Sequence, residues 1–176
     1  MWLFGYGSLT WKVDFHYEKK MVGYIEGFSR RFWQGSPDHR GTPNKPGRVV
    51  TLVRNPEEVV WGIAYKLSED SLNETISNLD HREKAGYSNM DILFHPQDCT
   101  VKPFHISVYV ANKHNPHYLG PASEKDIARQ VIDSYGPSGP NSEYLLQLAK
   151  VMRSIVPDYE DKHLYELEKL VQENIQ

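Results

Sequence analysis

Two short stretches of the sequence carry residues whose types and spacing could do chemistry. The first is the run Leu3, Phe4, Gly5, Tyr6, Gly7 and Ser8, in which two glycines, a tyrosine and a serine follow apolar residues. Glycine tolerates positive φ and leaves no side chain in the way, so successive main-chain N–H groups can converge on an anion. Such a turn suits a carboxylate or a developing oxyanion. A plain tight turn at the rim of a sheet fits the same residues.

The second stretch is "LDHREKAGY", residues Leu79 to Tyr87, which places Glu83 between an expected helix and an expected strand. A carboxylate at such a junction can point into a cleft and act as a general base. The alternative is that this charge run is a solvated helix end, which is the usual role of such runs.

Two other patterns are weaker indications of chemistry. The segment Arg30–Val50 combines basic residues with Phe32 and Trp33, a combination that can bind single-stranded nucleic acid. The charge balance of 20 Lys and Arg against 23 Asp and Glu instead favours a structured loop and no nucleic-acid partner. Of the eight histidines, only His114 and His117 lie close together, and no carboxylate-rich motif accompanies them. No metal is therefore predicted.

The length and composition of the chain limit the number of domains and the cellular compartment that we expect. A chain of 176 residues with 39% hydrophobic residues predicts one domain, residues 1–176. The single cysteine, Cys99, allows no internal disulfide and favours a reducing compartment. We find no apolar run of the roughly 18 residues that cross a bilayer and no basic leader, so we expect a cytosolic protein without membrane partners.

The first two-thirds of the chain is predicted to consist mainly of strands, which must position the candidate residues. The predicted strands are Trp2–Tyr6, Val22–Trp33, Arg48–Val53, Val59–Tyr65, Met90–His95 and Ile106–Ala111. Asn-Pro-Glu-Glu between the third and fourth strands is favourable turn chemistry and predicts a hairpin.

Helices are predicted mostly toward the C-terminus. Ser68 is expected to cap a helix that buries Leu72, Ile76 and Leu79, whereas Ser123 and Asn141 are expected to cap two later ones. The inward positions predicted for these later helices are Ile127, Val131, Ile132, Tyr135, Leu145, Leu148, Ala149, Met152 and Ile155; a last helix carries Leu164, Leu167, Leu170 and Val171. Strands first and helices last predict an α+β fold with an antiparallel or mixed sheet, closed as a small barrel.

Several of these segments together resemble the ChaC family, and more narrowly its glutathione-specific γ-glutamylcyclotransferases. The resemblance rests on "FGYGSLTW", on "FSRRFWQGSPDHRGTPNKPGRVVTL", on "WGIAY", "LDHREKAGY" and "YLGP", and on "GPSGPNSEYL", which follow one another along nearly the whole chain. His81 and Thr10 depart from the aromatic residue and the isoleucine that are usual in the family.

The resemblance implies a small β-barrel flanked by helices and a cofactor-independent enzyme that cleaves glutathione into 5-oxoproline and cysteinylglycine. The family's catalytic glutamate falls on Glu83, and its substrate loop falls on Leu3–Ser8. We further expect Tyr118 to line the pocket and Arg40 or Arg48 to attract the glycine carboxylate of the substrate. A homodimer is left open.

Two other functions remain open on the sequence alone. One keeps the cyclisation chemistry but acts on other γ-glutamyl amino acids or amines. The other is a non-catalytic barrel that binds small acidic ligands or a partner protein.

Overall fold

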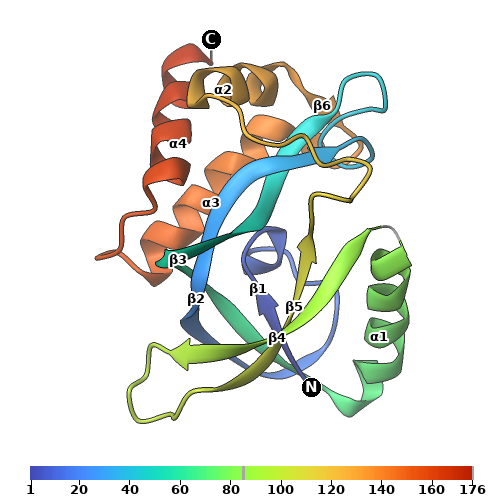
Figure 1. Cartoon of the computed structure of the whole chain (residues 1–176), viewed down its shortest axis with the longest axis vertical. Helices are drawn as coiled ribbons and strands as arrows, with labels where there is room; N and C mark the ends of the chain where they lie inside the picture. Colours follow the sequence, from blue (N-terminus) through green and yellow to red (C-terminus); the bar gives the residue numbers. More distant parts are fainter. Residues whose placement is uncertain (85, 176) are drawn as a thin grey trace. The chain divides into compact units, whose positions relative to one another are not determined.

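The strands close into a barrel in the order β1-β3-β2-β4-β5. Their bounds are β1 Trp2–Gly5, β2 Tyr17–Ser36, β3 Gly47–Leu67, β4 Tyr87–Pro96 and β5 Phe104–Ala111 (Figure 1). Strand β1 pairs antiparallel with β3 but parallel with β5, so the sheet is mixed. The predicted α+β barrel is confirmed.

The structure is a computed structural model that describes residues 1–84 and 86–175, without the side chains of residues 79–84. The chain divides into two compact units. The first unit consists of Met1–Ser29 and Leu52–Pro116, and the second consists of Arg30–Thr51 and His117–Gln176. Each unit has its own buried apolar core.

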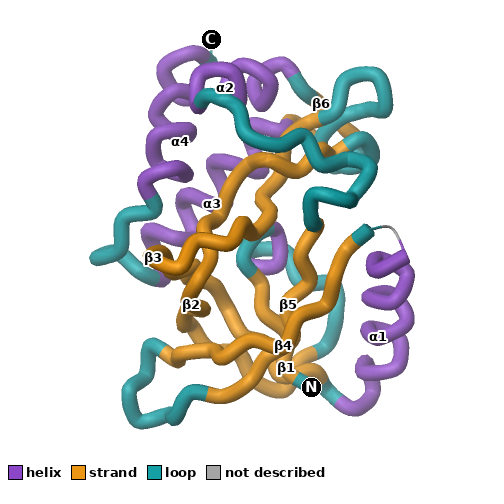
Figure 2. Tube along the Cα trace, viewed as in Figure 1, coloured by secondary structure: helices purple, strands orange, loops and turns teal. Residues whose placement is uncertain are grey.

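The helices lie mostly in the second half of the chain, as predicted. They are α1 Glu69–Lys84, α2 Glu124–Asp133, α3 Asn141–Ile155 and α4 Lys162–Asn174, with a short 3-10 turn, η1, at Ser8–Thr10 and a two-stranded ribbon of β6 Tyr135–Gly136 and β7 Gly139–Pro140 (Figure 2). The inward faces of α2, α3 and α4 form the apolar core of the second unit, with these residues fully or almost fully buried: Ile127, Val131, Leu145, Leu148, Ala149, Met152, Leu164, Leu167 and Val171.

The predicted hairpin at Asn-Pro-Glu-Glu is wrong, because β3 runs through this stretch as one strand. The side chains there are tied to the neighbouring strand instead of to each other across a turn. Ser29 on β2 donates a 2.6 Å hydrogen bond to Glu58 and accepts one of 3.0 Å from the Asn55 amide. An extended backbone also suits Asn55, since proline disfavours the helical region for the residue before it.

Helix α1 buries a different face from the one predicted. Its buried side chains among the described residues are Ser71 and Thr75, whereas Ile76 is 37% exposed and Leu72 is half-buried. The reason at Ser71 is polar: its hydroxyl donates a 2.7 Å hydrogen bond to the carbonyl of His16. Leu79, also predicted to point inward, has a side chain outside the described part of the structure.

The later helices follow the prediction with local corrections. The Ser123 hydroxyl caps α2 by accepting a 3.2 Å hydrogen bond from the Asp126 amide, as expected. Helix α2 ends at Asp133, so Tyr135 is 68% exposed and does not pack inward. Asn141 does not cap α3, since its side chain exchanges hydrogen bonds of 2.7 and 2.8 Å with the main chain of Arg48. It therefore ties the start of α3 to the start of β3.

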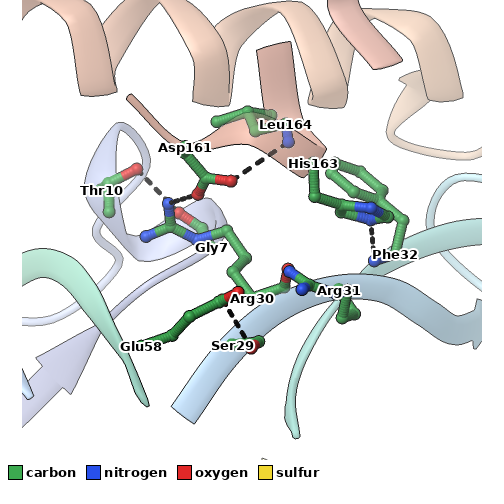
Figure 3. A network of polar contacts seen from close by, with 10 residues as sticks. All are labelled: Gly7, Thr10, Ser29, Arg30, Arg31, Phe32, Glu58, Asp161, His163 and Leu164. Carbon is green, nitrogen blue, oxygen red and sulfur yellow. Dashed lines mark hydrogen bonds and ion pairs between the residues drawn. The ribbon is translucent and has the colours of Figure 1, made fainter. Parts of the chain in front are cut away.

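A buried polar network fixes the start of α4 within the second unit (Figure 3). The Asp161 carboxylate caps the helix by accepting a hydrogen bond from the Leu164 amide and forms a 2.8 Å ion pair with Arg30. Beside it, the ring of His163 accepts a 3.1 Å hydrogen bond from the Phe32 amide. Burial, and after it the charge of Arg31, lowers the pKa of His163, so the imidazole stays a neutral acceptor.

Candidate active site at one rim of the barrel

The barrel topology brings the two chemically promising stretches to the same rim. Strand β5 lies between β1 and β4, with Leu3 opposite Ser107 in the parallel pair and Tyr87 opposite Ala111 in the antiparallel pair. Because parallel strands end at the same edge and an antiparallel neighbour begins there, the turn after β1 and the entry into β4 share that edge. This rim is the candidate active site.

The turn after β1 uses its carbonyl groups internally. The Gly7 carbonyl accepts hydrogen bonds from the Thr10 amide and hydroxyl at 2.9 and 2.8 Å, and the Ser8 carbonyl accepts from the amides of Trp11 and Lys12 at 3.1 and 2.8 Å. Within the described part of the chain, the amides of Gly7 and Ser8 donate no hydrogen bond. At Gly7 and Ser8 the carbonyls are therefore bonded internally while the amides remain available, which is the chemistry that an anion requires.

The shape of this turn depends on close packing instead of on positive φ. Neither Gly5 nor Gly7 is among the described glycines with positive φ, so the turn does not use that freedom at either position. A Cβ atom on Gly5 would lie 2.8 Å from the Cβ of Leu9, which leaves no room for a side chain. The Tyr65 hydroxyl donates a 2.6 Å hydrogen bond to the Leu9 carbonyl, and burial followed by the proximity of Tyr17 raises the pKa of Tyr65 to about 12. The phenol thus remains a donor at neutral pH.

The remaining residues of Leu3–Ser8 differ in what they present. Leu3 and Phe4 are each 2% exposed and belong to the barrel core, where the Phe4 and Phe94 rings lie 5.8 Å apart. Tyr6 is also buried, and its hydroxyl donates a 2.7 Å hydrogen bond to the carbonyl of Tyr109 on β5. Of the six residues predicted to bind substrate, Leu3 and Phe4 can therefore contribute only main-chain atoms.

Glu83 lies in the last turn of α1, and its side chain is outside the described part of the structure. The next described residue after the helix is Gly86, with a φ of +90°. Its carbonyl accepts a 3.2 Å hydrogen bond from the amide group of Asn115, in the loop after β5. Sequence analysis missed Asn115, because the His-Asn-Pro-His motif that contains it was examined only for its histidines.

Arg48 lies in the second unit, where its guanidinium group is bonded internally. It donates to the carbonyls of Phe32 and Gly120 at 3.0 and 3.3 Å and to the side chain of Gln130 at 2.6 Å. Burial lowers the pKa of Arg48, although it stays a cation at neutral pH. These contacts hold β2, β3 and α2 together, and a role in attracting substrate stays a prediction.

Arg40 and Tyr118 also lie in the second unit. Arg40 is 7% exposed and donates a 3.0 Å hydrogen bond to the Pro140 carbonyl, with the Glu143 carboxylate 3.4 Å away. Tyr118 is half-buried and forms a β-bridge with Gln34. Their predicted roles toward a ligand are likewise untested.

The described residues contain neither a candidate cluster of metal ligands nor a helix that could span a bilayer. No group of three or more His, Cys, Asp or Glu side chains there could hold a metal ion, and His114 is exposed. None of the described helices is long and apolar enough to cross a bilayer.

Comparison with known proteins places this barrel in a defined class. Its fold superposes on the crystal structure of a yeast γ-glutamyl cyclotransferase specific to glutathione with a TM-score of 0.86 and 28% sequence identity, covering 98% of this chain and 96% of that one. The ChaC-like protein family model matches residues 1–174. The chain belongs to the ChaC-like family.

Several curated proteins share much of the sequence. Glutathione-specific γ-glutamylcyclotransferase 1 of Mus musculus is 47% identical, covering 93% of this chain and 74% of the mouse protein. γ-Glutamylcyclotransferase 2-3 of Arabidopsis thaliana is 42% identical, covering 95% of this chain and 86% of the plant protein. The glutathione-specific enzyme of Schizosaccharomyces pombe is 34% identical, covering the whole chain and 94% of the yeast protein.

Proposed function

We propose that this protein degrades glutathione by cyclising its γ-glutamyl group, which releases 5-oxoproline and L-cysteinylglycine. The α-amine of the γ-glutamyl residue attacks its own γ-carbonyl carbon, a new C–N bond closes the five-membered ring, and the γ-amide C–N bond breaks. The reaction consumes no water and no oxidant, since the atoms and electrons of substrate and products balance. The observation that carries the proposal is the shared rim of the Gly5–Ser8 turn and the α1–β4 junction, in a chain of this family.

Glu83 is the proposed catalytic base. The attacking α-amine is mostly protonated at neutral pH and must lose a proton before it can act as a nucleophile. The Glu83 carboxylate takes that proton and passes it to the departing amide nitrogen, so the base is regenerated in one turnover.

The turn Leu3–Ser8 is the proposed binding element for the γ-glutamyl group. The amides of Gly7 and Ser8 donate to the α-carboxylate or to the oxyanion that grows on the γ-carbonyl. Holding both ends of the flexible γ-glutamyl chain also brings the amine close to the carbonyl. The entropy lost in reaching this geometry is a large part of the barrier to ring closure, so prior binding lowers that barrier.

A product assay tests the proposal. The protein is incubated with reduced glutathione, and 5-oxoproline and cysteinylglycine are measured by mass spectrometry. We expect equal amounts of both products with glutathione and none with N-acetylglutathione, whose amine is blocked. Faster turnover of γ-glutamyl dipeptides than of glutathione would favour the broader cyclotransferase, and no turnover of either substrate would favour a non-catalytic barrel. EDTA should leave the rate unchanged.

The proposed compartment is the cytosol. Cys99 is an exposed free thiol, which persists in a reducing environment, and the substrate is itself a thiol.

A further inference from the structure

Asn115 is an unusually buried polar residue for its position in the loop after β5. It is 4% exposed, whereas its neighbours Lys113, His114 and Pro116 are exposed. Its side-chain amide donates to the Gly86 carbonyl at 3.2 Å, and its own main-chain amide donates to the Asn112 carbonyl at 2.9 Å. The side chain thus reaches out of its loop to the chain that enters β4.

Gly86 and Asn115 fit each other closely. A Cβ atom on Gly86 would lie 3.0 Å from Nδ2 and 3.1 Å from Cα of Asn115, and the φ of +90° is one that side chains rarely adopt. Two independent constraints therefore require glycine here. The fit fixes Gly86, at the entry into β4, relative to the loop after β5.

A second contact from the same loop fixes the first residues of β4. The Asn112 side chain donates a 2.7 Å hydrogen bond to the Ser88 hydroxyl. On the other side of β5, the Tyr109 carbonyl accepts the hydrogen bond of Tyr6. The segment from Tyr109 to Asn115 consequently supports both chain segments of the rim.

We infer that Asn115 is a positioning residue for the cyclisation, which acts through Glu83 and does not touch the substrate. Glu83 precedes Gly86 by three residues, so the carbonyl that Asn115 holds belongs to the chain just after the proposed base. A displacement of about 1 Å in a catalytic group costs up to roughly 10²-fold in rate. This inference rests on the proposed function.

Two substitutions of Asn115 test it, with His114→Ala as a control at the exposed neighbouring residue of the same loop. Asn115→Ala removes the donor, and Asn115→Asp keeps the shape but faces the Gly86 carbonyl with a carboxylate. We expect kcat for glutathione to fall about 10-fold or more in both variants, with KM within about twofold of the wild type. His114→Ala should keep kcat within about threefold, because its side chain is exposed and takes no part in the hydrogen bond that holds Gly86. If Asn115→Ala does not fold, the isosteric Asn115→Asp carries the test.

A second readout separates positioning from general destabilisation. Hydrogen exchange of peptides covering Gly86 to Asn89 should speed up in Asn115→Ala while peptides from β2 stay protected. In a Glu83→Gln background, Asn115→Ala should lower the residual rate no further, since its effect passes through that carboxylate. A folded Asn115→Ala with wild-type kcat, or one whose loss persists in full without Glu83, would overturn the inference. A wild-type protein that makes no 5-oxoproline would instead refute the proposed function.

Discussion

The hydroxyl of Tyr6 donates a 2.7 Å hydrogen bond to the main-chain carbonyl of Tyr109, a residue 103 positions further along the chain. Tyr6 belongs to the turn after β1 and Tyr109 to β5, the strand that also pairs with β4. This contact anchors the donor-rich turn to the strand beside which the chain emerges from α1. It gives the turn a fixed place at the rim before any ligand arrives.

Replacing Tyr6 by phenylalanine should loosen that turn. The change leaves the Tyr109 carbonyl without this partner, which typically costs about 1–3 kcal/mol of unfolding free energy. We expect a rise in KM for glutathione of about 10-fold, measured by steady-state 5-oxoproline formation. Tyr24→Phe, on the outer aromatic cluster with Trp61 and His95, is the control and should leave KM unchanged. A wild-type KM in Tyr6→Phe would show that the anchor is dispensable for binding.

Glu83→Gln should reduce turnover to a small residual rate while the protein stays folded. The amide cannot accept the ammonium proton, and losing a general base typically costs about 10²–10⁴ in rate. Glutathione binding, measured by calorimetry, should survive. Glu74→Gln, an exposed residue of the same helix, is the matched control and should turn over normally. Near-normal activity of Glu83→Gln would remove this residue from the mechanism.

Gly5→Ala should distort the turn by overpacking. The added methyl group would stand 2.8 Å from the Cβ of Leu9 and 3.4 Å from the Tyr65 ring, so backbone must move. We expect a loss of about 1–3 kcal/mol in stability and a larger loss in kcat/KM than stability alone explains. Thermal melting and kinetics on the same sample check this. An active variant with a normal melting temperature would contradict the tight-turn description.

Tyr65 makes stability depend on pH on the alkaline side. Since its pKa is raised from 10.0 to about 12 in the folded state, the native protein holds this proton at a pH where the unfolded chain releases it. The stabilisation that the protonated Tyr65 gives to the folded state is complete below about pH 10 and is lost as pH rises toward about 12. Urea unfolding from about pH 8 upward should show this fall in the wild type and less of it in Tyr65→Phe. Parallel curves for the two proteins would contradict the expected shift.

Asp161→Asn should destabilise the second unit strongly. The Arg30 and Asp161 side chains are only 1% and 11% exposed, and removing one partner of a buried pair typically costs about 3–5 kcal/mol. The exposed Lys66–Glu18 pair offers a contrast, since Glu18→Gln should change the unfolding free energy little. Denaturant titration of both variants provides the measurement. Equal effects would indicate that burial of the Arg30 pair is energetically unimportant.

The sequence by itself determined the local elements and the residue types available for chemistry. Ser123 caps α2 as its spacing indicated, and Leu145, Leu148 and Met152 face inward on α3, because capping and helical period act over a few residues. The glycine-rich turn and the resemblance carried by Leu3–Ser8 and Glu83 were likewise legible in the sequence. The turn and the resemblance indicated the type of reaction, but they did not give the positions of the reacting groups in space.

Only the tertiary structure decided how distant segments support one another. The continuity of β3 depends on Ser29 from another strand, and the inward face of α1 depends on a carbonyl at His16. Asn115 was overlooked for the same reason, since its partner Gly86 lies 29 positions earlier in the chain. Local propensities cannot encode such contacts, because closing the barrel is what brings β1, β4 and β5 to one rim.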